Sequence, residues 1–463
     1  MRGSSTWLRR LCTAAMVALG LALLPVGALA ATTTINGSAT DSFGKTFTYK
    51  IEVPDPWNKT LVLYSHGYSF GPSPATDVGD PGTRAWLLAN GYAIAGSSYS
   101  TSGWALQQAF ADQIQTLDIF ASQVGTPTRT IAWGHSLGGM ITAGLVQLFP
   151  DRFNAALPMC GVVAGGPGVW NQGLDSEFAL AILQAPFKMV GFTSFGDAAA
   201  NFGIASAALA AAQNTAAGRA RIALSAALAD VPGWFDPASA EPAPTDYAAQ
   251  EVNQFNWDNN PDFLFGFFGR AELEARAGGN YSWNTGVDYR VQLSHSVDAA
   301  EVKALYAAAG LDLNAELDTL NAAPRISVTN PNALAYITKY ITYNGNLNIP
   351  VLTLHTTGDG LVEVTDENTY ASVVRSTGSN SMLRQVYVHR AGHCTFTPAK
   401  TITAFQTLVH RLDSGSWQDS TSPASMNSQA TSLGSALNSA PASFINFRPD
   451  QFLRPFDSRD VAA

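Results

Sequence analysis

The segment Thr130–Gly139 constrains the fold of this chain more than any other stretch. A short apolar run leads into Gly134-His135-Ser136-Leu137-Gly138 and then directly into a helical pattern that ends at Pro150. A strand, a sharp turn and a helix in this order predict a strained turn that exposes the hydroxyl of Ser136 at a sheet edge. Ser136 is therefore a candidate nucleophile. The alternative is a chance motif in a glycine-rich chain.

The first 30 residues have the composition of a secretory signal peptide. Basic residues precede an apolar run from Leu11 to Val26, and Ala28-Leu29-Ala30 supplies the small residues of a cleavage site. The alternative, an N-terminal membrane anchor, is disfavoured because the run is short and no stop-transfer segment follows it. We expect residues 1–30 to be removed and the mature protein to be secreted, by either the general or the twin-arginine route.

Charge restricts the partners of the mature chain. The full sequence has a net charge of −9, and the predicted signal peptide contains arginines but no acidic residues, so the mature chain is more acidic still. An acidic protein is unsuited to nucleic acid or to anionic membranes. We therefore expect a small-molecule substrate, with no nucleic acid and no stable membrane anchor, and the sequence carries no signal for an oligomeric state.

Residues 31–166 alternate between strand and helix patterns. Apolar and polar residues alternate from Phe47 to Val53, which is typical of a half-buried strand, and Leu61 to Tyr64 are continuously apolar, which is typical of a buried one. Helical patterns separate the later strands. This alternation predicts an α/β fold with a mostly parallel central sheet covered on both faces.

The remaining chain divides by composition into three further parts. Residues 167–346 are alanine-rich and helical in pattern, with many Phe and Trp residues, and predict a helical cap inserted into the sheet domain. Strand and helix patterns return in residues 347–414, the second part of the core. Residues 415–463 are rich in Ser, Ala and Asn and predict a surface linker followed by a C-terminal tail.

Two residues after the cap complete a possible catalytic set with Ser136. Asp359 follows an apolar strand pattern in a Gly-Asp-Gly turn, and His393 follows the last strand pattern. A serine needs a base to take its proton, and the base needs an acid to orient it and to stabilise its charge. We predict His393 as the base and Asp359 as the acid, with Glu363 as the alternative acid.

With its order of nucleophile, acid and histidine, the chain resembles the α/β-hydrolase superfamily. The motif residues are His66-Gly67-Tyr68, Gly134–Gly138, Asp359 and His393, and the resemblance covers Thr32 to Leu412. Such enzymes stabilise a tetrahedral oxyanion with preorganised N–H groups. We assign this role to the backbone N–H groups of Leu137 and Tyr68. The other histidines lack metal-ligand spacing, so we expect no metal and no cofactor.

The two cysteines of the mature chain are candidates for one disulfide, Cys160–Cys394, because export supplies an oxidising compartment. Cys394 directly follows His393, which resembles the tannase and fungal feruloyl esterase pattern of a disulfide between the nucleophile and histidine loops. The chain departs from that pattern, since His135 and not a cysteine precedes Ser136. The alternative is two buried free thiols. The layout is also similar to secreted esterases and amidases of the phthalyl-amidase kind.

These features favour a secreted serine hydrolase that cleaves carboxylic esters through an acyl-enzyme intermediate. The aromatic-rich cap favours substrates with an aromatic or apolar part. Three alternatives remain open at this point: an amidase or peptidase with the same triad, a secreted acyltransferase, and a non-catalytic binding protein on a hydrolase fold.

Overall fold

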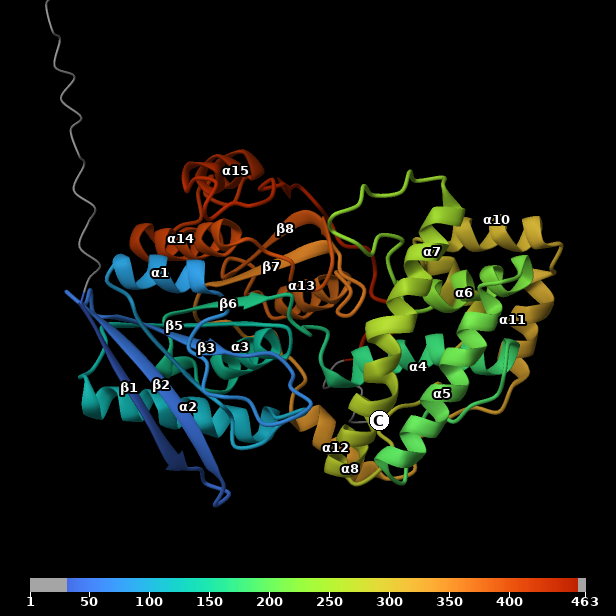
Figure 1. Ribbon diagram of the computed structural model, residues 1–463, viewed down its shortest axis with the longest axis horizontal. Coiled ribbons are helices and arrows are strands. Elements are labelled where there is room, and N and C mark those ends of the chain that lie inside the picture. Colours follow the sequence, from blue (N-terminus) through green and yellow to red (C-terminus); the bar gives the residue numbers. More distant parts are fainter. Residues whose placement is uncertain (1–30, 457–463) are drawn as a thin grey trace, which may run out of the picture.

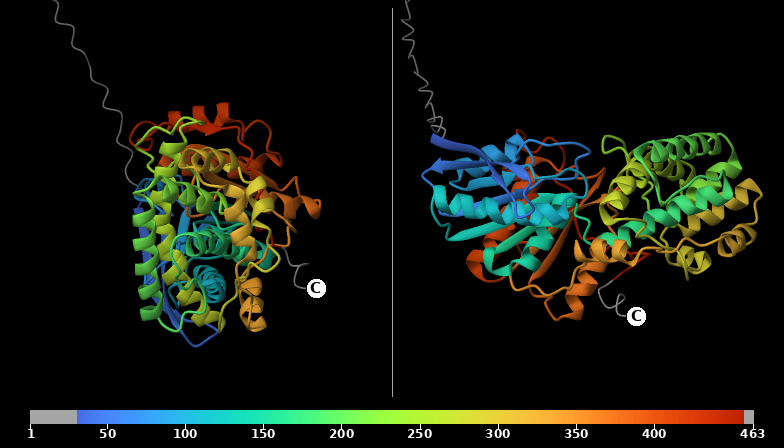
Figure 2. Two further views of the ribbon diagram at one scale, coloured as in Figure 1. Left: turned by 90° about the vertical axis from the view of Figure 1, so that its right-hand side faces the viewer. Right: turned by 90° about the horizontal axis from the view of Figure 1, so that it is seen from below.

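The computed structural model describes residues 31–456. The predicted signal peptide, residues 1–30, lies outside this range, as do residues 457–463. The molecule has two lobes that lie side by side, one built on a sheet and the other made of helices (Figures 1 and 2). The described residues contain no helix that is long and apolar enough to cross a membrane.

The sheet lobe contains all the strands of the described chain. Their bounds are β1 (Ala31–Thr40), β2 (Thr46–Asp55), β3 (Thr60–Ser65), β4 (Ala93–Ser97), β5 (Arg129–His135), β6 (Ala155–Met159), β7 (Val351–Gly358), β8 (Leu383–Ala391) and β9 (Phe444–Ile445). They form one sheet in the order β1-β2-β4-β3-β5-β6-β7-β8-β9. The pairs from β4 to β8 are parallel, whereas β1, β2 and β9 add antiparallel edges. The predicted α/β-hydrolase architecture, a mostly parallel sheet with a helical insertion, is confirmed.

Helices cover both faces of this sheet. Their bounds are α1 (Pro81–Ala89), α2 (Leu106–Gln123), α3 (Leu137–Leu148), the 3-10 turn η1 (Pro150–Arg152), α13 (Asp366–Ser376), α14 (Pro398–Ser414) and α15 (Pro423–Ser432). Leu61 and Leu63 face an apolar cluster with α2, α3 and α13, whereas Val62 faces a second cluster with α1, α14 and α15. The continuous apolar sequence of β3 follows from this two-sided burial, because alternate side chains enter opposite cores.

The helical lobe is the chain between β6 and β7. Its elements are α4 (Gly166–Leu183), α5 (Phe195–Ala212), α6 (Ala216–Ala227), α7 (Tyr247–Trp257), the π-helical turns η2 (Asp258–Asp262) and η3 (Phe265–Gly269), α8 (Arg270–Ala277), α9 (Tyr289–His295), α10 (Ala299–Ala309), α11 (Leu313–Ala322) and α12 (Pro331–Lys339). The lobe has apolar clusters of its own, centred on residues such as Phe178, Leu224 and Phe267. By contrast, Ile337 of α12 packs into the core of the sheet lobe.

The chain after Ser414 differs from the predicted surface linker. Trp417, Met426 and Ala430 are buried against the sheet lobe, and Phe444 starts β9, which pairs with β8. These few large apolar residues are scattered among Ser, Ala and Asn without a regular period, so the local pattern did not indicate their burial. The last described residues then cross to the helical lobe, where Phe456 packs against Trp283.

Candidate active site

The turn at Ser136 joins β5 to α3 in a strained backbone conformation. Ser136 has φ 58° and ψ −125°, a region that non-glycine residues rarely occupy. A Cβ added at Gly134 would lie 2.4 Å from the carbonyl oxygen of Gly138, and one at Gly138 would lie 2.0 Å from that of Ser65. Both positions therefore require glycine, as the sequence motif indicated.

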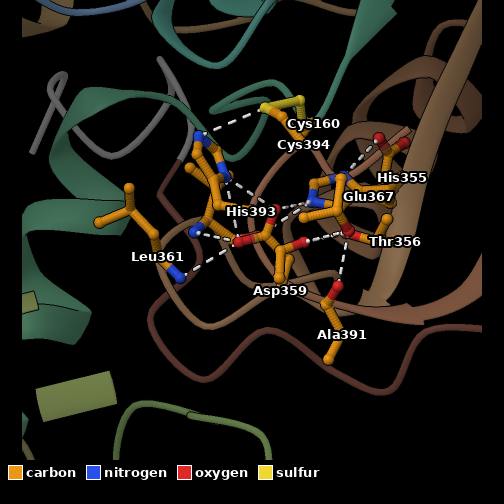
Figure 3. Close-up of a disulfide and its surroundings, with 12 residues drawn as sticks. Cys160, His355, Thr356, Asp359, Leu361, Glu367, Ala391, His393 and Cys394 are labelled. Carbon is orange, nitrogen blue, oxygen red and sulfur yellow. Dashed lines mark hydrogen bonds and ion pairs between the residues drawn. A yellow bond between two sulfur atoms is a disulfide. The ribbon is translucent and has the colours of Figure 1, made fainter. Parts of the chain in front are cut away.

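Asp359 and His393 meet beyond the carboxyl ends of β7 and β8. The Nδ1 atom of His393 lies 2.8 Å and 3.1 Å from the two carboxylate oxygens of Asp359 (Figure 3). The backbone N–H groups of Leu361 and Val362 donate to Oδ1 of Asp359 at 3.2 Å and 3.1 Å. Burial alone would raise the pKa of Asp359, but the adjacent His393 and His355 hold it well below its ordinary value.

A disulfide joins Cys160, after β6, to Cys394, next to His393. The Cα atoms are 5.4 Å apart, and 234 positions separate the two cysteines in sequence. Both cysteines have positive φ angles, 41° and 55°, which are unfavourable for residues with a side chain. The Sγ atom of Cys394 lies 3.4 Å from Nε2 of His393. The disulfide therefore contacts the edge of the imidazole opposite Asp359.

The loop after β3 lies against the serine turn. A Cβ added at Gly67 would lie 3.4 Å from Cβ of Ser136, so this loop approaches the nucleophile closely. His66 stacks on Tyr99 with ring centroids 3.9 Å apart, and the Tyr99 hydroxyl donates to the His66 carbonyl oxygen at 3.0 Å. These contacts brace the loop, and His66 takes no part in the Asp359–His393 pair.

A cavity that is open to solvent extends from Ser136 between the two lobes. The sheet lobe contributes Tyr68, Trp104, Ser136, Leu137 and the loop after Asp359. The helical lobe contributes α4 and both π-helical turns, with Trp170, Phe263 and Phe265 among the aromatic residues. Phe268 of η3 does not line the cavity and packs against Phe202.

Carboxyl groups also line this cavity, and of these the sequence indicated only Glu363. They are Glu177, Asp258, Asp262 and Glu363, and Arg270 lies among them. Burial raises the pKa of Glu177 to about 8, although Arg270 opposes the shift, and burial also raises the pKa of Asp258 to about 8. No described residue hydrogen-bonds Oε2 of Glu177 or Oδ2 of Asp258. The cavity is therefore aromatic but not uniformly apolar.

The structure brings most of the predicted site residues to one edge of the sheet. Ser136, Leu137 and Tyr68 line the cavity, and Asp359 and His393 are paired beside it. Glu363, the alternative acid, lines the cavity, whereas both carboxylate oxygens near His393 Nδ1 belong to Asp359. Among residues 31–456, no group of three or more His, Cys, Asp or Glu side chains could hold a metal ion.

A histidine for which the sequence predicted no chemistry also lies next to the Asp359–His393 pair. His355 lies inside β7 with its side chain fully buried, and its Nε2 atom is 3.6 Å from Oδ2 of Asp359. His355 has no metal-ligand spacing to the other histidines, so the sequence predicted no role for it. Its position within a buried strand was an available signal, since a buried imidazole needs polar partners.

Sequence comparisons agree with this geometry. Residues 91–164, which include the serine turn, match the model of the prolyl oligopeptidase family, Peptidase S9. The parallel sheet, the strained turn at Ser136 and this match identify the chain as a member of the α/β-hydrolase superfamily and as a serine hydrolase. Within that class it is similar to the o-phthalyl amidase of Xanthobacter agilis, with 28% identity over 412 residues that cover 82% of this chain and 88% of the relative.

Two esterases are among the solved structures that align with this chain. Feruloyl esterase B from Aspergillus oryzae aligns with a TM-score of 0.41 and 13% identity, covering 83% of this chain and 81% of that one. The rice cell wall degrading esterase LipA from Xanthomonas oryzae aligns with a TM-score of 0.36 and 13% identity, covering 82% and 89%.

Proposed function

We propose that this protein is a secreted serine hydrolase that cleaves carboxylic esters through a Ser136–His393–Asp359 triad. The observation that carries the proposal is the pairing of Asp359 with Nδ1 of His393 beside a cavity that contains Ser136. Secretion is supported by the signal-like residues 1–30 and by the disulfide, since disulfides persist mainly in oxidising compartments.

The proton positions favour His393 as the base. A carboxylate only accepts hydrogen bonds, so Nδ1 of His393 donates to Asp359 and Nε2 of the neutral ring keeps a free lone pair. The neighbouring disulfide sulfur carries no hydrogen and leaves that lone pair available. Nε2 then takes the proton of Ser136 as Oγ attacks the carbonyl carbon, and later returns it to the leaving group.

Charge on the tetrahedral intermediate falls on an oxygen that needs nearby donors. We assign this role to the backbone N–H groups of Leu137 and Tyr68. Leu137 is the first residue of α3, where unpaired N–H groups point out of the helix end. Tyr68 follows Gly67, and the close approach of Gly67 to Ser136 places this loop beside the nucleophile.

The cavity favours a substrate with an aromatic part. Trp104, Trp170, Phe263 and Phe265 offer ring faces and edges to a planar group. An amide substrate is the second candidate, because the relative from Xanthobacter agilis is an o-phthalyl amidase. The same serine chemistry serves both, and the leaving group distinguishes them.

The test is the reaction of the purified mature protein with p-nitrophenyl benzoate and with the matching p-nitroanilide. A fluorophosphonate should label wild type but not Ser136→Ala, which should lose on the order of 10⁶ in kcat. Asp359→Asn should lose roughly 10⁴ by favouring the wrong imidazole tautomer. Glu363→Gln is the matched control and should retain most of the activity.

Two results would contradict the proposal. Retention of more than a few per cent of activity by Ser136→Ala would remove the serine assignment. A larger loss in Glu363→Gln than in Asp359→Asn would move the acid to Glu363. Faster cleavage of the anilide than of the ester, at equal concentration, would favour the amidase.

A further inference from the structure

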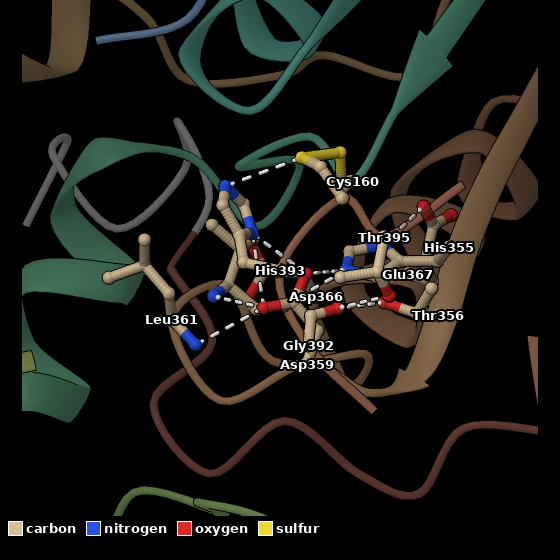
Figure 4. A network of polar contacts seen from close by, with 12 residues as sticks. Cys160, His355, Thr356, Asp359, Leu361, Asp366, Glu367, Gly392, His393 and Thr395 are labelled. Atoms are coloured by element: carbon tan, nitrogen blue, oxygen red, sulfur yellow. Dashed lines mark hydrogen bonds and ion pairs between the residues drawn. A yellow bond between two sulfur atoms is a disulfide. The ribbon is translucent and has the colours of Figure 1, made fainter. Parts of the chain in front are cut away.

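A second buried histidine lies directly behind the Asp359–His393 pair. His355 and Asp359 are both fully buried, and Nε2 of His355 lies 3.6 Å from Oδ2 of Asp359 (Figure 4). On its other side, Nδ1 of His355 lies 3.1 Å from Oε1 of Glu367, which belongs to α13. Asp359 is thus placed between two imidazole rings, and His355 between two carboxylates.

Every polar group that faces the ring of His355 is an acceptor. Nε2 lies 2.9 Å from the carbonyl oxygen of Val362, which cannot donate, so this nitrogen carries a hydrogen. Nδ1 faces only the carboxyl group of Glu367. A neutral imidazole carries a hydrogen on one nitrogen alone. The hydrogen between Nδ1 and Glu367 is therefore bound either to Nδ1, which makes the ring an imidazolium, or to the carboxyl group of Glu367.

A proton on Glu367 could be bound only at Oε1, where it would face Nδ1 of His355. Its Oε2 atom accepts from the Thr353 hydroxyl at 2.6 Å and from the side-chain amide of Gln385 on β8. Its Oε1 atom faces His355. Because an imidazole is a stronger base than a carboxylate, we assign the hydrogen between Oε1 and Nδ1 to Nδ1 of His355.

We propose that His355 is a buried imidazolium that positions Asp359 and keeps it ionised. It is a positioning residue and does not touch the substrate. The inference deepens the proposed function, since it concerns the acid of the proposed triad. Glu367, His355, Asp359 and His393 form a row of alternating charge sign whenever His393 is protonated.

The surrounding charges agree with this assignment. Burial lowers the pKa of His355, but the neighbouring carboxylates of Asp359 and Glu367 raise it to about 10. The other titratable group facing it from α13 is Asp366, whose pKa burial raises to about 8 and whose Oδ2 accepts from the backbone N–H of Ala164 at 3.2 Å. His393 faces it from the loop after β8, across Asp359.

The consequence for catalysis is a change in the pH profile. A fixed positive charge on His355 opposes the protonation of His393, because the two rings share one carboxylate. Removal of that charge lets His393 take up a proton at higher pH, where it can no longer act as base. The acid limb of the kcat/KM profile should therefore move to higher pH when His355 is neutralised.

The first measurement uses the wild-type protein with ¹⁵N-labelled histidine. A signal that is absent from His355→Gln, or shifted in Glu367→Gln, identifies this ring. We expect both of its nitrogens to be protonated, with no titration between pH 5 and pH 9. A neutral tautomer at pH 7 would overturn the proposal. This result depends on neither activity nor the triad, so it stays separate from the outcome of the Ser136→Ala test.

The second measurement compares pH profiles of kcat/KM. His355→Gln keeps an amide donor and removes the charge, and it should shift the acid limb upward by about one pH unit. Thr353→Val is the matched control, since it removes a buried hydrogen bond to Glu367 but leaves the charges of Glu367, His355 and Asp359 in place. Equal profiles for His355→Gln and wild type, or equal shifts in both variants, would overturn the proposal. If His355→Gln does not fold, the wild-type spectrum decides.

Discussion

Loss of the Cys160–Cys394 disulfide is expected to lower both stability and kcat. The bridge closes a loop of 234 positions that includes the whole helical lobe. In the chain-entropy model, closing a loop of this length in the unfolded state is worth about 5 kcal/mol, and measured values commonly fall between about 2 and 4 kcal/mol. We therefore expect a decrease of about 2 to 5 kcal/mol in the free energy of unfolding on reduction.

The effect on activity follows from the neighbourhood of His393. Cys394 is the next residue, and its sulfur lies 3.4 Å from Nε2 of His393. The backbone at both cysteines has a positive φ, and reduction allows it to move toward more favourable angles. The histidine loop should then lose its fixed position, so kcat should decrease while KM changes little.

The assay compares oxidised and reduced wild type, and then the double variant Cys160→Ala/Cys394→Ala. Urea denaturation followed by tryptophan fluorescence should give a midpoint roughly 1 M lower without the bridge. The reduced wild type separates the loss of the bond from the loss of sulfur packing in the variant. An unchanged midpoint together with an unchanged kcat in the reduced protein would refute this reasoning.

Two further predictions concern the cavity. Phe265→Ala should raise KM for aromatic esters and leave acetyl esters nearly unchanged, whereas Phe268→Ala, outside the cavity, should alter neither KM; equal KM effects in the two variants would contradict the assignment. Glu177 has a folded pKa of about 8 against an ordinary value of 4.5, so its stabilising contribution is complete below pH 4.5 and is lost as pH rises through 8. Glu177→Gln should therefore reduce the fall in melting temperature between pH 5 and pH 9, and an unchanged slope would count against protonation of Glu177 at neutral pH.

The sequence predicted those parts of the fold and site that depend on local pattern. The serine turn could be predicted because close backbone packing leaves no room for a side chain at Gly134 or Gly138. The glycines that this packing requires are part of the motif itself. Asp359 and His393 were predictable as strand-end residues, since the carboxyl ends of parallel strands meet at one edge.

The remainder depends on tertiary contacts that no local pattern encodes. Glu177 and Arg270 enter the cavity from α4 and α8, helices whose arrangement the alanine-rich sequence does not specify. The burial of Trp417 and Met426 likewise depends on packing against the sheet. His355 is intermediate, because a histidine within an apolar strand indicates a buried partner without saying which one.

The C-terminal segment has a consequence for how substrate reaches Ser136. After β9, the backbone carbonyl of Pro449 accepts from Asn368 of the sheet lobe at 2.9 Å. Further on, Arg454 pairs with the buried Asp175 of α4 and donates to the Trp283 carbonyl oxygen at 2.7 Å. The C-terminal segment thus links the two lobes, in addition to the chain connections that follow β6 and precede β7.

A swing of the helical lobe away from the sheet lobe would strain this third connection or break the buried Arg454–Asp175 pair, which is a costly step. We therefore expect the helical lobe to act as a fixed wall and not as a moving lid. On this basis we expect the shape of the opening, and not a closing motion, to select the substrates of the proposed hydrolase.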